Sequence, residues 1–282
     1  MVNLLKTFRL GKILSILLGV FTISIYTLGS VKLLQDAPNL SNLIWGLVSL
    51  FFIVSAGYLM NDYSDLKYDL VNKPWKAMVS KVLAEKNVKL LFVAFFLIGL
   101  LSALLVNLWF FLIITADLIV LVLYNLFSKK LFYLKSAVVS LLVVSIYPLS
   151  FAITSGGISS LRRDSLFIFP IWLFFMILAY ELAEDILDIK GDKAGGGSTI
   201  PIKIGSKRTR RLAILIALLA TPIAFVPFYY GMCGKVYLIG ALLSLPLFVG
   251  SMFFKELILS KGLLFYVRAI TVSSLVDIIL VK

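Results

Sequence analysis

Residues 41–69 read SNLIWGLVSLFFIVSAGYLMNDYSDLKYD, an uncharged apolar segment that runs directly into three aspartates. The uncharged part, residues 41–61, is about as long as a helix must be to cross a lipid bilayer. Asp62, Asp65 and Asp69 follow at offsets of 0, 3 and 7, and at about 100° per residue these offsets share one face of a helix. The stretch therefore predicts a transmembrane helix that ends in a stripe of carboxylates.

The rest of the chain repeats this apolar pattern. Of its 282 residues, 61% are hydrophobic and only 15% charged, and the mean hydropathy is +1.05, which excludes a soluble domain. We predict an all-α integral membrane protein with a single transmembrane domain over residues 1–282. Nine stretches are long and apolar enough to span a bilayer: residues 13–33, 41–61, 88–106, 108–126, 136–155, 166–183, 211–231, 235–253 and 262–281.

The basic residues predict an orientation. Composition changes sharply in three connectors, residues 62–87, 127–135 and 184–210. With the N-terminus in the cytoplasm, 21 of the 27 basic residues lie on the cytoplasmic side and five outside, with Arg268 within the last span. The positive-inside rule thus predicts a multi-pass cell-membrane protein whose N-terminus and charged connectors are cytoplasmic. We interpret the net charge of +13 as the signal that orients the chain in the membrane. No nucleic-acid partner is therefore expected.

The composition also excludes several kinds of chemistry. The chain has no histidine and a single cysteine, Cys233. Zinc sites, disulfide frameworks and Ser-His triads are therefore excluded. Any catalysis must use carboxylates, lysines, arginines and tyrosines.

A second acidic stripe resembles the first. Eight of the fourteen acidic residues lie in two windows, and the second window is YELAEDILDIKGD at residues 180–192. Glu181, Asp185, Asp188 and Asp192 have offsets of 0, 4, 7 and 11, again one helical face, with Glu184 at its edge. Such like charges repel unless cations lie between them. Mg²⁺, which binds carboxylates together with substrate phosphates, meets this need, so two facing stripes predict a diphosphate site. The alternative is two solvated loops in which acids neutralise lysines.

Basic residues accompany the stripes. Lys73 and Lys76 follow the first stripe, and Lys129 and Lys130 follow Tyr124 at the end of the fourth span. They are placed to neutralise the charge of a departing phosphate group. Lysines in cytoplasmic loops also serve simply to fix the orientation of the chain in the membrane. For Lys129 both a role at the phosphate and this orienting role stay open.

At these residues the sequence resembles the UbiA family of intramembrane prenyltransferases. The family's first motif, Asn-Asp-x-x-Asp-x-x-x-Asp, is matched in full by Asn61, Asp62, Asp65 and Asp69. The second motif is matched by Glu181, Asp185, Asp188, Gly191 and Asp192, and STIPIKIG follows at residues 198–205. Tyr124 with Lys129 resembles a third family element.

The resemblance implies an enzyme that ionises an isoprenyl diphosphate with Mg²⁺ and transfers the prenyl group to a lipophilic or aromatic acceptor, releasing pyrophosphate. It implies a bundle of nine helices around a central cavity that membrane lipid can reach. The implied metal ligands are Asp62, Asp65, Asp69, Glu181, Asp185, Asp188 and Asp192. The implied catalytic residues are Asp62, Asp65, Asp69, Asp185, Asp188, Tyr124 and Lys129. The implied substrate-binding residues are Asn61, Lys73, Lys76, Lys130, Glu181 and Asp192.

Departures from the family pattern leave the acceptor open. Tyr180 and Glu184 stand where an arginine and a lysine are common, and Lys76 replaces an arginine after the first motif. The loss of these cations weakens the expectation of a second phosphorylated substrate such as a glycerol phosphate. A UbiA-type terpene cyclase that needs no acceptor is the alternative, and a divalent-cation transporter is a further one.

Three charged residues lie within the predicted spans: Asp117, Arg268 and Asp277. Charges inside a membrane usually pair or line a cavity. Asp117 precedes Tyr124 by seven residues, which places it on the same helical face about two turns deeper. We expect Asp117 to pair with Arg268. The alternative is that it binds the acceptor or stabilises the carbocation.

Overall fold

The structure is a computed structural model that describes residues 9–28, 37–64, 85–127, 134–154, 164–194 and 196–280. Within these ranges all regular secondary structure is helical. The N-terminal half holds α2 (Leu10–Leu28), α3 (Ala37–Ser64), α6 (Glu85–Leu104), α7 (Leu108–Phe127), α8 (Leu134–Val144) and α9 (Ile146–Ile153). The C-terminal half holds α10 (Ser165–Leu187), α11 (Ile189–Ala194), α12 (Ile200–Ile204), α13 (Ser206–Ala220), the 3₁₀ helix η3 (Thr221–Phe225), α14 (Val226–Tyr229), α15 (Lys235–Ser251) and α16 (Glu256–Leu280).

Eight segments of the described chain are long and apolar enough to cross a membrane, which confirms an all-helical membrane protein. The ninth predicted span, residues 235–253, corresponds to α15, an apolar helix of only 17 residues. The structure therefore has eight candidate spans and one shorter apolar helix where the sequence predicts nine spans. The connector predicted at residues 184–210 is largely helical, because α11, α12 and the start of α13 lie in it.

Prolines divide two of the spans into shorter helices. Pro148 has no N–H to bond the carbonyl of Val144, and α8 accordingly ends at Val144 while α9 begins at Ile146. Ser145 lies at this break and donates its hydroxyl to the carbonyl of Leu142 at 2.8 Å. In the later span, Pro222 and Pro227 stand at the starts of η3 and α14. These breaks bend the helices without removing them from the bundle.

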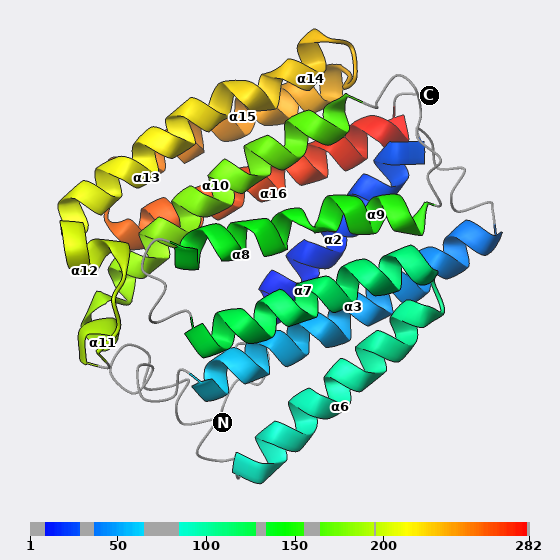
Figure 1. Ribbon diagram of the computed structural model, residues 1–282. Coiled ribbons are helices and arrows are strands. Elements are labelled where there is room, and N and C mark those ends of the chain that lie inside the picture. Colours follow the sequence, from blue (N-terminus) through cyan, green and yellow to red (C-terminus); the bar gives the residue numbers. More distant parts are fainter. Residues whose placement is uncertain are drawn as a thin grey trace, which may run out of the picture.

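Six segments form a closed ring: α2, α3, α7, the divided span α8–α9, α10 and α16. Each segment contacts the next in this order, and α16 contacts α2. The other long helices pack outside it: α6 on α3, α13 on α10, and α15 on α16. Figure 1 shows α6 at one edge of the molecule, α13 and α15 at the opposite edge, and α2 in between. Large apolar side chains such as Trp109 and Phe253, 72% and 82% exposed, project from the bundle, as expected for contact with lipid.

The pair α15–α16 is held by small residues and one buried carboxylate. A Cβ atom at Gly240 would lie 2.6 Å from Cβ of Ser273, so the two helices approach closely only because residue 240 is a glycine. Asp277 of α16 is buried and accepts hydrogen bonds from the backbone N–H groups of Gly234 at 2.6 Å and Tyr237 at 3.2 Å. It thus caps the N-terminus of α15, which is a structural role for one of the three charges within the spans.

Candidate active site

The ring of helices encloses a cavity of about 620 Å³. Its lining residues come from α2 and the preceding Arg9, from α3, α7, α8, α9, α10, α11 and α16, and from the breaks Ser145 and Asp188. None come from α6, α13 or α15. Most of the wall is apolar, with side chains such as Phe169, Trp172 and Leu173. The carboxylates gather at the end of the bundle where α3 and α10 finish and α8 begins. The cavity is therefore long and apolar with one strongly polar end, a shape that suits an amphiphilic ligand.

The second acidic motif lies at this polar end. Glu181 and Asp185 belong to α10, Asp188 is the residue at which α10 ends, and Asp192 belongs to α11; all four line the cavity. The helix predicted through the whole motif is interrupted at Asp188. The stripe survives the break because the N–H of Asp192 still bonds the carbonyl of Asp188 at 3.0 Å.

Lys135 lies between two acids of this motif. Its ammonium group forms an ion pair with Asp185 and lies 3.9 Å from Asp192. Ser136 donates a hydrogen bond of 3.0 Å to the other carboxylate oxygen of Asp185. Asp185 and Asp192 are almost fully buried, so this lysine supplies the positive charge that such carboxylates need.

The first acidic motif is described only in part. Asn61 lines the cavity, and the neighbouring Asp62 forms an ion pair of 2.6 Å with Arg9, which also lines it. The guanidinium carbon of Arg9 lies 4.8 Å from the centroid of the Tyr58 ring. Asp65 and Asp69 lie outside the described residues, so their predicted common face with Asp62 stays a prediction.

Of the other predicted site residues, only Tyr124 is described. It lines the cavity and interacts electrostatically with Lys135. Lys73, Lys76, Lys129 and Lys130 lie outside the described residues, and their roles stay predictions.

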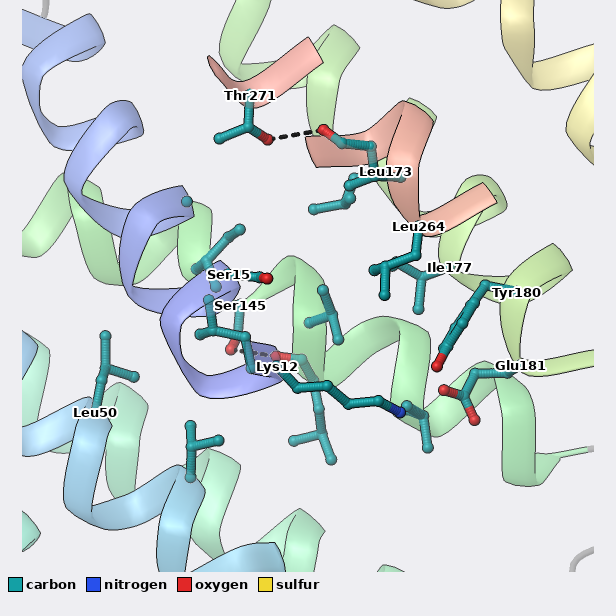
Figure 2. A pocket seen from close by; sticks show the side chains of 18 of the residues that line it. Lys12, Ser15, Leu50, Ser145, Leu173, Ile177, Tyr180, Glu181, Leu264 and Thr271 are labelled. Atoms are coloured by element: carbon teal, nitrogen blue, oxygen red, sulfur yellow. Dashed lines mark hydrogen bonds between the residues drawn. The ribbon is translucent and has the colours of Figure 1, made fainter. Parts of the chain in front are cut away.

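The structure brings three further cations to the site: Arg9, Lys12 and Lys135. Lys12 lies with its ammonium nitrogen 5.2 Å from the centroid of the Tyr180 ring and interacts electrostatically with Glu181. Figure 2 shows its side chain crossing from α2 toward both residues. The positive-inside rule counts all three among the 21 cytoplasmic basic residues and predicts no role for them in the site. The spacing of Arg9 and Lys12, three residues apart at the start of an apolar helix, was the only local sign that they share a face.

The predicted pair of Asp117 and Arg268 is wrong. Arg268 donates hydrogen bonds to Ser15 Oγ at 2.9 Å and to the carbonyl of Gly11 at 3.2 Å, so it joins α16 to α2. Asp117 lies on α7 and interacts with Ser145 at the break between α8 and α9. Arg268 lies on α16, which contacts α2, whereas Asp117 lies on α7, which contacts α3, α8 and α9. The two residues are therefore on different sides of the ring. Asp117 lines the cavity, so binding of the acceptor stays open as its role.

The acids at the polar end of the cavity are possible ligands for a metal ion. No group of three or more acids or cysteines in the described part of the chain is close enough to hold one. The chemistry of the donors nevertheless suits Mg²⁺, because Asp185, Asp188 and Asp192 all line the cavity and offer carboxylate oxygens, with no imidazole or thiolate among them. Lys135 and Arg9 occupy the positions beside Asp185 and Asp62 where a metal ion would supply the balancing charge.

Together these features describe a class of protein: a helical membrane protein with an intramembrane cavity whose acidic end suits a cation and an anionic ligand group. Residues 22–256 match the UbiA prenyltransferase family. The chain therefore belongs to the UbiA prenyltransferase family, and it is a prenyltransferase. This confirms the resemblance found in the motifs, and it favours an enzyme over a cation transporter.

Two relatives are digeranylgeranylglyceryl phosphate synthases. The one from Sulfurisphaera tokodaii is 27% identical over 238 residues, which cover 83% of this chain and 79% of the relative. The one from Thermococcus kodakarensis is 30% identical over 211 residues, which cover 75% and 74%.

Solved structures of the family share the fold. A UbiA homologue from Aeropyrum pernix K1 superposes with a TM-score of 0.71 at 17% identity, covering 92% of this chain and 96% of the homologue. One from Archaeoglobus fulgidus bound to GPP and Mg²⁺ gives a TM-score of 0.68 at 16% identity, covering 97% and 98%. That homologue thus binds a prenyl diphosphate together with the metal ion that the acidic stripes of this chain predict.

Proposed function

We propose that the chain transfers a geranylgeranyl group from geranylgeranyl diphosphate to the free hydroxyl group of geranylgeranylglyceryl phosphate. The observation that carries the proposal is the cavity, whose apolar walls suit isoprenoid chains and whose polar end holds both carboxylates and cations. The names of the relatives supply the product, digeranylgeranylglyceryl phosphate.

In this proposal the acids of both motifs hold Mg²⁺ and, through it, the diphosphate. The ligands are Asp62, Asp65, Asp69, Glu181, Asp185, Asp188 and Asp192. Bound Mg²⁺ would neutralise charge on the departing pyrophosphate. Asn61, Tyr124 and the basic residues Lys73, Lys76, Lys129 and Lys130 position the diphosphate. The apolar wall excludes water, which would otherwise capture the allylic cation before the acceptor does.

The acceptor hydroxyl oxygen then forms the new C–O bond at the carbon whose bond to the pyrophosphate oxygen has broken, and the hydroxyl proton passes to the released pyrophosphate. The missing cations at Tyr180 and Glu184 argued against a phosphorylated acceptor. Lys12, reaching beside Tyr180 from α2, supplies positive charge near one of these positions and so supports such an acceptor. In the membrane we place the N-terminus and the motif connectors in the cytoplasm, on the strength of the basic-residue bias.

The test uses purified full-length protein in lipid nanodiscs with Mg²⁺ and geranylgeranyl diphosphate. Three reactions run in parallel: with geranylgeranylglyceryl phosphate, with an aromatic acceptor such as a hydroxybenzoate, and with no acceptor. Mass spectrometry of the products should find digeranylgeranylglyceryl phosphate in the first reaction alone. A prenylated aromatic product, or a cyclic hydrocarbon without acceptor, would contradict the proposal and favour the corresponding alternative. Chelation of the metal should stop product formation.

A further inference from the structure

One carboxylate of the cavity wall lies outside both acidic motifs. The other lining acids of the described residues all belong to the second acidic window, residues 180–192, whereas Asp117 belongs to α7. Asp117 is the tenth of the 20 residues of α7, a candidate span, so it lies near the middle of the bilayer. A carboxylate at this depth is costly and usually serves a function.

Asp117 has a neutral partner, in contrast to Asp185, which pairs with Lys135. Within the described part of the chain, the side chain that interacts with Asp117 is Ser145, which lies at the break between α8 and α9. Ser145 has a single hydroxyl proton and also donates to the carbonyl of Leu142 at 2.8 Å. A carboxylate can accept about four hydrogen bonds. Asp117 therefore keeps free acceptor capacity toward the cavity, which Ser145 also lines (Figure 2).

The face of α7 that lines the cavity places Asp117 inward of the proposed diphosphate site. Its lining residues are Ile114, Asp117, Leu121 and Tyr124, and their spacing of 3, 4 and 3 residues is one helical face. Tyr124 lies at the polar end, where it interacts electrostatically with Lys135. Asp117 lies two turns, or roughly 10 Å, farther along the helix axis. A diphosphate held at the polar end directs its prenyl carbon toward this inner part of the cavity, and the acceptor must meet the carbon there.

We propose that Asp117 is the general base that takes the proton of the acceptor hydroxyl. This inference rests on the proposed function. The hydroxyl donates a hydrogen bond to the carboxylate, which turns a lone pair of the hydroxyl oxygen toward the reacting carbon. As the new C–O bond forms, the O–H bond breaks and its proton passes to Asp117. The pyrophosphate has left with the electron pair of its broken C–O bond, and Asp117 then gives it the proton, which regenerates the carboxylate. Ser145 is a positioning residue that orients the carboxylate.

The experiment compares two acceptors that differ in one atom: geranylgeranylglyceryl phosphate, and its analogue with a thiol in place of the free hydroxyl. Wild type, Asp117→Asn and the control Thr115→Val are assayed with Mg²⁺ and saturating geranylgeranyl diphosphate. Thr115 lies on the same helix but outside the cavity lining, and it donates to the carbonyl of Phe111 at 2.7 Å.

Asp117→Asn keeps the size of the side chain but cannot take the proton. It should lower kcat with the hydroxyl acceptor by about 10²-fold, a typical loss for a general base. With the thiol acceptor, which gives up its proton far more readily, the loss should stay within about fivefold. The KM for geranylgeranyl diphosphate should change by less than about twofold, and Thr115→Val should match wild type with both acceptors.

Ser145→Ala is a second variant, for which the same dependence on the acceptor is expected with a smaller loss. Thermal melting in detergent verifies folding, and if Asp117→Asn does not fold, Ser145→Ala decides. Equal losses with both acceptors, or a raised KM for geranylgeranyl diphosphate, would overturn the assignment of a general base. A wild type that makes no digeranylgeranylglyceryl phosphate would overturn the proposed function together with this inference. An active wild type with an unaltered Asp117→Asn variant would overturn this inference alone.

Discussion

Two acids of the second motif, Asp185 and Asp188, lie at the end of α10, where Asp185 is buried and Asp188 is partly exposed. Asp185 lies in the last turn of α10, Asp188 is the residue at which the helix ends, and both line the cavity. Carboxylate oxygens are the donors that Mg²⁺ prefers, so these two residues are the first to test as metal ligands.

Asp185→Asn and Asp188→Asn should each lower turnover by at least about 10²-fold, because in the proposed mechanism each removes a negative charge that would hold Mg²⁺ in the transition state. The matched control is Asp164→Asn, an exposed aspartate at the opposite end of α10. Turnover is measured with saturating donor, and thermal melting in detergent verifies folding. Near-normal rates in both motif variants would show that these acids do not hold the metal.

Lys135 balances the charge of Asp185, and this pair gives a test by stability. The two side chains are 12% and 4% exposed, and removing one partner of such a pair typically costs about 3–5 kcal/mol. Lys135→Met should therefore lower the melting temperature in EDTA. Mg²⁺ should raise it more in the variant than in wild type, since the ion supplies the missing charge. Lys135→Met combined with Asp185→Asn should recover part of the loss, and identical Mg²⁺ responses would count against a metal site at Asp185.

At the scale of helices, close approach depends on where the small residues are. Gly240 and Gly250 both belong to α15, but only Gly240 faces α16 closely. A Cβ at Gly240 would meet Ser273, whereas a Cβ at Gly250 would meet nothing within 4 Å.

Gly240→Ala should destabilise the protein by about 1–3 kcal/mol through overpacking. Gly250→Ala should be neutral or stabilising by up to about 1 kcal/mol, because alanine is the better helix former. Melting of the two variants in the same detergent makes the comparison, and Ser273→Gly should rescue Gly240→Ala. Equal effects of the two glycine variants would mean that α15 packs on α16 in another register.

For the whole molecule, the orientation in the membrane is the main prediction that the fold does not decide. It rests on the 21 basic residues assigned to one side against five on the other. Two exposed positions at opposite ends of the bundle report it: Tyr230, which follows α14, and Lys207 on α13.

Single cysteines are introduced at these positions in a Cys233→Ser background, because Cys233 is the native thiol. A membrane-impermeant maleimide applied to intact cells should label Tyr230→Cys, and it should label Lys207→Cys only after permeabilisation. The reverse pattern would invert the topology and place the active-site end outside.

Much of the protein follows from the sequence because the responsible interactions are local. A run of about 20 apolar residues forms a helix in lipid whatever surrounds it, since its backbone can be satisfied in no other way there. The spacing of Glu181, Asp185 and Asp188 on one helical face likewise needs only the period of the helix. These local features were enough to predict the membrane class and the family.

Tertiary structure decided how the charges pair. Arg9 meets Asp62 across 53 residues of sequence, and Lys135 meets Asp185 across 50. Neither pair has a local signature, and the pair expected from burial alone, Asp117 with Arg268, does not form. Which charges meet depends on which helices are neighbours in the ring, and helix neighbours are chosen by side-chain packing summed over whole faces, so no single motif in the sequence carries that information.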